Sequence, residues 1–445
     1  MTDCIQQNLE FQGLDGRRVD ANFKGGYLSS DGGSLYLREI DCRHRFMKRL
    51  ARCFRDDRKQ DRTEHSVEQL LCQRIFGLAL GYEDLNDHDR LRYDPLLAVS
   101  CGKKDPLGLT RRDEADRGKA LAGKSTLNRL ELAIKGPDPR YKKIVADAEA
   151  VEATLLEWGV AALPRKRGMI VLDFDATDDR IHGQQEGRFF HGYYGHYCYL
   201  PLYCFCGNIP LWAQLRTSGR DASDGTVEAL EKIVAAIRKR FGRNKKILVR
   251  GDSGFARDAI MSWCEGRKNV FYCLGLARNE RLEHRLGSAF AVIDQLIDEN
   301  VLEAPCRIFQ DFTYRTRESW SCRRRVVGKA ELTEAGRNPR FVVTNLAAEE
   351  IAPEALYEEI YCARGSMENQ IKVQQMDLFA DRTSTQIFDA NQLRLWFSAF
   401  AHLLVETLRA EVLKDTALAD ATIGQIRLRF FKLAARVKVS CRRIL

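Results

Sequence analysis

The sequence predicts an α/β protein with a carboxylate-bearing central sheet, a helical N-terminal region, an inserted β-subdomain and a basic C-terminal tail. Three observations lead to this prediction. Residues 168–280 alternate between apolar strands and amphipathic helices, as an α/β sheet does. Two of these apolar strands end in an acid. Arginine-rich segments that alternate like antiparallel strands interrupt the rhythm over residues 281–340.

The first acid-bearing strand covers residues 168–177 and rises through a β-branched apolar run to Asp173 and Asp175. Alternate side chains of a strand share a face, so we expect both carboxylates to point the same way. Buried carboxylates are costly unless a cation pairs with them, and oxygen ligands suit hard metals. A second apolar strand, residues 246–251, ends in Asp252. Together the strands predict a metal site at one sheet edge; ordinary surface acids at exposed strand ends are the alternative.

The order of elements over residues 166–280 is that of an RNase H-like core. A tight hairpin is expected at Gly207 and Asn208. The expected elements are strands at 168–177, 197–205 and 209–215, a helix over 224–241, the Asp252 strand, a helix over 256–266 and a strand over 270–276.

Residues 281–340 are interpreted as an inserted β-strand subdomain, with an ordinary extension of the sheet as the alternative. The second part of the core then covers residues 341–415, with a strand over 341–345, a helical stretch over 357–375 and an apolar helix over 393–408. Tyr361, Arg364 and Glu368 are spaced i, i+3 and i+7, so they share one face of that helical stretch. A surface acid paired with a neighbouring base is the alternative for Glu368.

Residues 1–165 are predicted to form an extended arm followed by helices that bind DNA. Aromatic residues in the first 36 positions, such as Phe11 and Phe23, indicate that the arm packs on another surface. Eight arginines and two lysines lie between Arg38 and Arg62, and Ser66 is expected to cap a helix. A solvated helix face is the alternative to a DNA-binding one.

The C-terminal tail, residues 416–445, is predicted to contact nucleic acid. From residue 425 to the end it carries seven Lys or Arg side chains and no acid, interleaved with apolar residues. A membrane-surface helix is the less favoured alternative.

One motif match is misleading. Residues 118–125 fit the P-loop pattern letter for letter. A P-loop needs a buried strand before it, whereas residues 111–117 are almost all charged. Nucleotide binding is therefore not expected, and Ser125 and Thr126 are predicted to begin a helix over residues 127–134.

Composition excludes several other classes of protein. The 445 residues carry a net charge of +9, and the 14 cysteines form neither a zinc spacing nor a disulfide framework. This usage is typical of a reducing cytoplasm. No apolar run approaches the ~20 residues of a membrane span.

Taken together, residues 172–177, 250–255, 361–368 and 435–444 resemble bacterial insertion-sequence transposases of the DDE type. The closest likeness is to the cut-and-paste branch with a Y-R-E-K signature and a β-insertion, near the group named after insertion sequence thirteen-eighty. The resemblance implies an endonuclease that cleaves and transfers DNA strands at terminal inverted repeats. It also implies double-stranded transposon and target DNA as partners, a homodimeric synaptic complex, no membrane and a location in the bacterial cytoplasm at the nucleoid.

The same resemblance implies the roles of individual residues. Asp175, Asp252 and Glu368 would hold two Mg²⁺ ions, for which Mn²⁺ can substitute, with Asp173 as the alternative first acid. The signature tyrosine and arginine fall on Tyr361 and Arg364. The signature lysine position holds Gln375, and the nearest lysine, Lys372, lies one turn after Glu368. Trp320 is the candidate for stacking on a flipped base.

Two rival functions remain open from the residues. One is a transposase-derived DNA-binding protein without catalysis. The other is a haloacid-dehalogenase-type phosphatase, in which Asp173 is the nucleophile and Asp175 the general acid. That second family needs an acid at position 256, where this chain has Ala256. Loss of Glu368 would disable a transposase and leave a phosphatase unaffected.

Overall fold

The computed structural model describes residues 8–134, 143–165 and 168–445. They form two compact units, one built from the chain up to Asp147 together with Thr407–Leu445, the other from Ala148–Glu406. The division lies earlier than the expected boundary at residue 165 because α7 (Ala148–Ala162) packs on β11 and α8 of the second unit. The basic tail, expected as a separate segment, belongs to the first unit.

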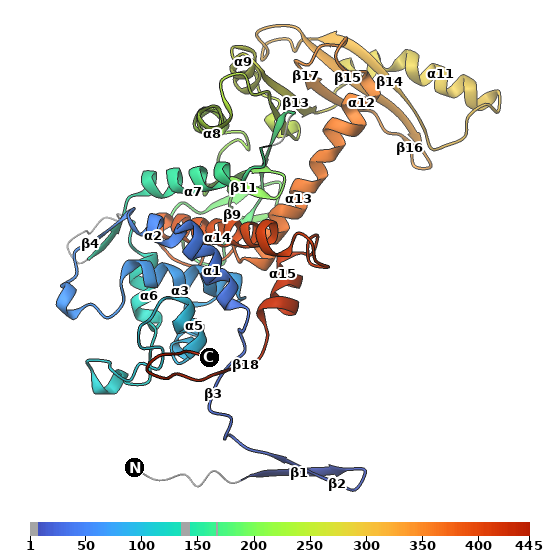
Figure 1. The fold of residues 1–445 in the computed structure, drawn as a ribbon. Coiled ribbons are helices and arrows are strands. Elements are labelled where there is room, and N and C mark those ends of the chain that lie inside the picture. The colour runs from blue at the N-terminus through green and yellow to red at the C-terminus, as the bar shows by residue number, and fades with distance from the viewer. Residues whose placement is uncertain (1–7, 135–142, 166–167) are drawn as a thin grey trace. The chain divides into compact units, whose positions relative to one another are not determined.

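The second unit is built on a nine-stranded mixed sheet (Figure 1). In the order β11-β10-β6-β12-β13, β10 is antiparallel to both of its neighbours, whereas β6, β12 and β13 run parallel. This arrangement of strands and helices fits the RNase H-like type and confirms that part of the prediction. The strands are β6 (Ile170–Ala176), β10 (Leu202–Cys206), β11 (Ile209–Gln214), β12 (Ile247–Gly251), β13 (Val270–Leu276), β14 (Cys306–Tyr314), β15 (Arg324–Thr333), β16 (Gly336–Arg337) and β17 (Arg340–Thr344).

The hairpin between β10 and β11 forms where it was predicted, with Gly207 in the left-handed region at φ 59°. The strand expected over residues 197–205 is two strands, because Pro201 lies between β9 (His196–Tyr199) and β10 and has no N–H for a ladder. β9 pairs with β7 (Asp179–Arg180) and β8 (Phe189–His191) in a separate small sheet.

The segment between β13 and β17 extends the core sheet instead of forming a subdomain of its own. β17 pairs with β13, β15 with β17 and β14 with β15, so the alternative of a sheet extension is the observed one. Two helices, α10 (Glu280–Arg285) and α11 (Gly287–Asp298), precede these strands where only strands were expected. The apolar residues of α11 pack on β14 and β15 (Figure 1).

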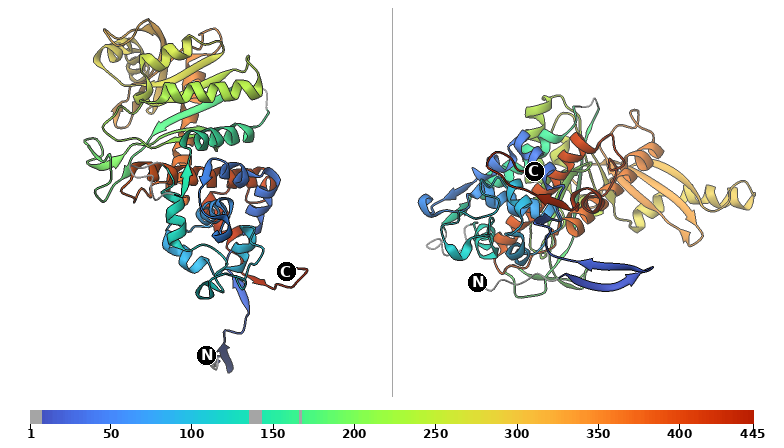
Figure 2. Two further views of the ribbon diagram at one scale, coloured as in Figure 1. Left: turned by 90° about the vertical axis from the view of Figure 1, so that its left-hand side faces the viewer. Right: turned by 60° about the horizontal axis from the view of Figure 1, so that its bottom comes forward.

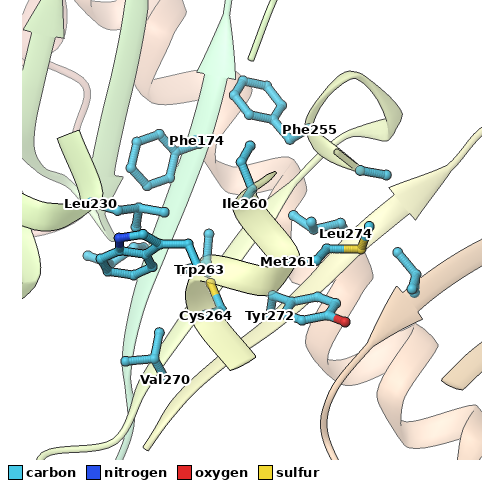
Figure 3. Packing of buried hydrophobic residues seen from close by; sticks show 14 of the residues in the cluster. Phe174, Leu230, Phe255, Ile260, Met261, Trp263, Cys264, Val270, Tyr272 and Leu274 are labelled. Carbon is cyan, nitrogen blue, oxygen red and sulfur yellow. The ribbon is translucent and has the colours of Figure 1, made fainter. Parts of the chain in front are cut away.

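The main apolar core lies between one face of the sheet and helices α7 to α11. Phe174 of β6 and Phe255 pack there beside Leu230 of α8 (Thr226–Phe241) and Trp263 of α9 (Asp258–Glu265) (Figure 3). Helices α7 and α8 lie side by side (Figure 2). The neighbouring residues of β6 in sequence therefore point to the other face.

That other face is covered by the helical segment predicted over residues 357–375. It consists of α12 (Pro353–Ala355), a π-helical stretch Leu356–Tyr361, a 3-10 turn Cys362–Arg364, α13 (Gly365–Lys372) and a second π-helical stretch Val373–Asp377. Leu356 and Tyr357 pack there against Leu248 of β12 and Val342 of β17. The apolar helix expected over residues 393–408 is α14 (Phe388–Leu408).

The first unit is mainly helical. The predicted cap at Ser66 is present: its hydroxyl accepts from the Gln69 amide at 3.2 Å in a full capping box. The helix expected after residue 126 begins earlier, at Lys124, and a 3-10 turn precedes it where a P-loop would need a strand. The helices are α1 (Ser34–His44), α2 (Phe46–Ala51), α3 (Val67–Ala79), α4 (His88–Leu91), α5 (Pro95–Ser100), α6 (Lys124–Glu131) and α15 (Ile423–Ile426).

Three two-stranded sheets complete the first unit. β4 (Phe54–Asp56) pairs with β5 (Ile144–Ala146). The arm forms a hairpin of β1 (Leu9–Leu14) and β2 (Arg17–Ala21), which is exposed at every residue. The expectation that its aromatic residues pack on another surface is wrong within the described chain, because Phe11 and Phe23 are exposed.

The basic tail is partly structural. Its strand β18 (Ala435–Val437) pairs with β3 (Tyr27–Ser29), and Lys432 donates to buried Asp31 at 2.7 Å. Arg427 donates to the Ala79 carbonyl at 3.1 Å. The remaining five basic side chains of the tail are exposed: Arg429, Arg436, Lys438, Arg442 and Arg443. None of the described helices is long and apolar enough to cross a membrane.

Candidate active site

The candidate site lies where the C-terminal ends of β6 and β12 meet the helical segment over residues 353–377. In β6, Leu172 and Phe174 point into the main core, so Asp173 and Asp175 lie on the opposite face. This confirms that the two acids point the same way. β12 runs parallel to β6 with Arg250 opposite Asp173. Both strands therefore deliver polar side chains to the same place under the helix.

A buried ion pair anchors this face. Arg250 donates from Nε to one oxygen of Asp173 at 2.6 Å and from Nη2 to the other at 2.7 Å. The two side chains are 8% and 3% exposed. Burial raises the pKa of Asp173, while the guanidinium lowers it; the net direction is upward. Both carboxylate oxygens of Asp173 are thus occupied by Arg250.

The same guanidinium also holds the helical segment. Arg250 Nη1 donates to the Ile360 carbonyl at 2.6 Å, and Nη2 lies 3.4 Å from the Ala363 carbonyl. These carbonyls belong to the turns that carry Tyr361 and Arg364. A second link joins α13 to the β10–β11 hairpin, where Gln370 donates to the side chain of Asn208. The buried side chain of Arg250 on β12 therefore contacts both β6 and the helical segment that leads to Glu368.

Arg364 bridges two of the predicted acids. Its Nη1 lies 3.0 Å from Asp175 Oδ2, and its Nη2 lies 3.3 Å from Glu368 Oε1. Asp175 and Arg364 are 15% and 14% exposed, whereas the side chain of Glu368 is 57% exposed. The arrangement brings Asp175, Arg364 and Glu368 together, and the i,i+4 contact of Arg364 with Glu368 agrees with the predicted common face of these two helical residues.

Asp252 follows β12 directly and joins the same group. Its Oδ1 accepts from the Gly254 amide at 2.8 Å, which fixes the carboxylate at the start of a short turn. Burial and the negative charge of Asp252 raise the pKa of Asp175 to about 6, against the lowering effect of Arg364. Two acids from adjacent strands therefore lie close enough at this edge for their charges to interact.

Tyr361 reaches the turn after Asp252 because β13 has a glycine there. A Cβ on Gly275 would lie 2.5 Å from the Tyr361 hydroxyl and 2.9 Å from the Ser253 amide nitrogen. Only a residue without a side chain leaves this space to the phenol. Burial raises the pKa of Tyr361, so the hydroxyl stays protonated and can donate a hydrogen bond.

The carboxylates suit a hard divalent cation. Asp175 and Asp252 bring two negative charges close together, and the Arg364 guanidinium partly neutralises them. Within the described ranges, however, no three His, Cys, Asp or Glu side chains are grouped closely enough to hold an ion. Arg364 lies between Asp175 and Glu368, so all three acids can share a cation only if that guanidinium moves.

The signature lysine position is used structurally. Gln375 donates from Nε2 to Asp179 Oδ1 at 2.9 Å and to the Asp178 carbonyl at 3.1 Å. Asp179 is fully buried, and burial raises its pKa to about 8. Lys372, by contrast, is exposed at the end of α13.

Trp320 does not fit the predicted role of stacking on a flipped base. It is 3% exposed and packs edge-on against Tyr314, with the Arg324 guanidinium over its ring. Both ring contacts come from the extended sheet itself. The expectation is wrong for this conformation, because no face of the indole is free.

Sequence reasoning missed the anchoring role of Arg250. A signal was present: an arginine interrupts the apolar strand Ile247–Gly251 at a position that shares a face with the acids. A buried arginine inside a strand needs an acidic partner, and the strand register places it opposite Asp173.

Comparisons with known proteins identify the family to which the chain is related. The family described as transposase DDE domain group 1 matches residues 11–445. Among solved structures, the chain is similar to piggyBac transposase in a synaptic complex with hairpin DNA, with 11% identity and a TM-score of 0.38 over 92% of this chain and 87% of that one. A search of the curated proteins found no match.

Proposed function

Because the chain belongs to group 1 of the DDE transposase family and is a DNA transposase, we propose that it moves a bacterial insertion sequence by cut-and-paste transposition. It would cleave both ends of the element at terminal inverted repeats and join them to target DNA. The observation that carries the proposal is the Arg364 bridge between Asp175 and Glu368, beside Asp252. Acids from two strands and a helix converge there on one positive charge.

Asp175, Asp252 and Glu368 are the proposed ligands of two Mg²⁺ ions, for which Mn²⁺ can substitute. Bound there, the ions would supply the activated nucleophile, water or a DNA 3′-hydroxyl, and charge stabilisation of the leaving oxygen. Asp175 is favoured over Asp173 as the first ligand, since both oxygens of Asp173 already accept from Arg250.

The remaining side chains would position the DNA. Once displaced from the acids, Arg364 can donate two parallel hydrogen bonds to a phosphate. The protonated hydroxyl of Tyr361 lies beside the turn after Asp252 and can donate to a neighbouring phosphate oxygen. Lys372 is exposed one turn beyond Glu368 and would contribute a flexible positive charge.

The contacts of Asp173 count against the phosphatase alternative. A phosphatase nucleophile must approach a phosphorus atom, yet Asp173 is 2% exposed and bonded through both oxygens to Arg250. Ala256, at the position where that family needs an acid, is buried as well. A DNA-binding protein without catalysis would have no use for three converging acids.

The proposed partners are duplex DNA at the inverted repeats, target DNA and a second copy of the chain in a synaptic homodimer. We place the enzyme in the bacterial cytoplasm, at the nucleoid. The exposed bases of the C-terminal tail, such as Arg442 and Arg443, would add to DNA affinity.

The test is Mg²⁺-dependent cleavage of a duplex that carries the element's own ends. We expect Asp252→Asn and Glu368→Gln to abolish cleavage while DNA binding persists. The matched control is Glu354→Gln, an exposed acid on α12, which should cleave normally. Cleavage that survives Glu368→Gln would refute the three-acid site, and wild-type binding without cleavage would favour the DNA-binding alternative.

A further inference from the structure

A strongly basic cavity of about 600 Å³ lies within the first unit, and all of its described lining residues belong to that unit. Eight Lys or Arg side chains line it, against three carboxylates. The basic side chains come from the segment after β4, from the residue after α4, from the loop before α6, from α6 itself and from the residue before β5. The cavity therefore gathers positive charge from five separate stretches of chain.

The few acids of the wall are already engaged. Asp116 pairs with Lys119 at 3.0 Å, and Asp89 accepts from the Lys124 amide at 3.1 Å. Glu64, the third acid, accepts from the Arg112 amide at 3.3 Å and lies 3.8 Å from Arg111. In the part of the chain that the structure describes, Lys59 and Arg129 have no ion pair, and both are exposed. The wall thus retains positive charge that no carboxylate neutralises.

Two buried donors in the wall also lack acceptors. The Nε atoms of Arg92 and Arg111 are buried, and neither has a hydrogen-bond partner among the described residues; the nearest acid to Arg111 Nε is Glu64, whose Oε2 lies 3.8 Å away, beyond hydrogen-bond distance. A buried donor without an acceptor costs about 1–3 kcal/mol. Both side chains line the cavity, so an anion with several oxygens bound there could satisfy them.

His65 shows the same excess of donors. Its Nε2 lies 2.8 Å from Arg111 Nη1, and its Nδ1 lies 3.2 Å from Lys103 Nζ. Both neighbours can only donate, whereas a neutral imidazole accepts at one nitrogen alone. Burial and these charges lower the pKa of His65 to about 3. Even the histidine therefore adds no negative charge or spare acceptor.

The P-loop-like sequence contributes to this cavity without forming a P-loop. Gly123 and Ser125 line the wall where α6 begins, and the helix has no side-chain cap. A helix N-terminus favours negative charge. Among the described residues, the lining includes one large apolar side chain, Leu121, and no Phe, Tyr or Trp, so the wall lacks the large aromatic rings on which nucleobases usually stack.

We propose that this cavity clamps a backbone phosphate of the duplex DNA on which the enzyme acts. The proposal rests on the proposed function, because that function makes DNA the substrate. The oxygens of the phosphate would accept from Arg92 and Arg111, while Lys59 and Arg129 close around the same strand. Such contacts position the DNA without reading its sequence.

The test is binding of the duplex by the full-length protein in the absence of divalent metal, over a series of salt concentrations. We expect the double variant Lys59→Gln/Arg129→Gln to bind about 10- to 100-fold more weakly and its salt slope to fall by about 1–2. Both residues are exposed, so folding should be preserved. The control is Lys239→Gln/Arg243→Gln, two exposed bases of the second unit, which should retain wild-type affinity and slope.

The outcomes separate the cavity from the catalytic proposal. Unchanged affinity and slope in the cavity variant would overturn the phosphate clamp, even if the wild type cleaves DNA normally. A wild type that binds through the cavity but never cleaves would support the clamp and overturn the proposed function. Pyrophosphate serves as the probe for free phosphates. If the cavity variant loses pyrophosphate binding while the salt dependence of its DNA binding stays that of the wild type, the cavity binds free phosphates and the DNA clamp is overturned.

Discussion

Replacing Arg250 by methionine should both destabilise the protein and misplace its catalytic helix. The change keeps an unbranched side chain but removes the guanidinium, and it leaves Asp173 as a buried carboxylate without its hydrogen-bond partner. Removing one member of a buried ion pair costs about 3–5 kcal/mol. The pair here is 8% and 3% exposed and bonded through two short contacts, so we expect the full effect.

The pH dependence of the free energy of unfolding distinguishes loss of the ion pair from the effect of a cavity left by the smaller side chain. Without Arg250, burial acts on Asp173 against the charge of Arg364 alone, and the pKa of that carboxyl rises further. The folded state then binds a proton that the unfolded chain releases, so the free energy of unfolding should fall as pH rises above the ordinary carboxyl range. The slope is at most about 1.4 kcal/mol per pH unit. Asp173→Asn in the same background should remove that slope.

The assay combines urea unfolding with cleavage rates on the element's ends. Arg250 also holds the Ile360 carbonyl at 2.6 Å, so the variant should lose cleavage by about a hundredfold per folded molecule. The matched control is Arg325→Met. Arg325 pairs with Asp311 and holds the Leu346 carbonyl in the sheet extension, so it should lose stability but not cleavage. Stability within about 1 kcal/mol of the wild type, or normal cleavage by Arg250→Met, would refute the anchoring argument.

Three further predictions concern the second unit. Asp179 has a pKa of about 8 in the folded state against 3.8 for a free carboxyl, so the free energy of unfolding should fall as pH rises between those values. In urea titrations Asp179→Asn should flatten this pH dependence, and an unchanged slope would contradict the assignment to Asp179. Gly275→Ala would place a Cβ 2.5 Å from the Tyr361 hydroxyl, and cleavage should fall more than about tenfold with DNA binding unaltered; normal single-turnover kinetics would count against this role. Arg364→Gln removes the guanidinium between Asp175 and Glu368, so Mn²⁺ titrated in the absence of DNA should bind about tenfold more tightly. Cleavage should nevertheless be lost. Equal Mn²⁺ affinity in the variant and the wild type would show that Arg364 does not compete with the metal.

Much of the site was determined by local pattern. The apolar alternation around Asp173 and Asp175 placed both on one face, because side chains of a strand alternate whatever surrounds them. The spacing of Arg364 and Glu368 likewise follows from the helical repeat. Ser66 capped its helix for the same local reason, through amides only a few residues away.

Other features depended on contacts between distant segments. The side-chain pattern of β15 is the same whether the strand joins the core sheet or a separate subdomain. Its pairing with β17 depends on backbone hydrogen bonds, which leave no pattern in the sequence. The family resemblance made Trp320 the candidate for stacking on a flipped base, yet the extended sheet buries it against Tyr314.

The sequence by itself thus determined which side chains share a face, where helices begin and which strands end in acids, since these depend on periods of two or about 3.6 residues. Only the tertiary structure decided how the buried charges are balanced. Arg250 took both oxygens of Asp173, and Arg364 joined Asp175 to Glu368. The periodicity of the sequence indicates that a charged side chain is buried. The group that neutralises this charge comes from another element, and which group it is depends on distance and burial in three dimensions.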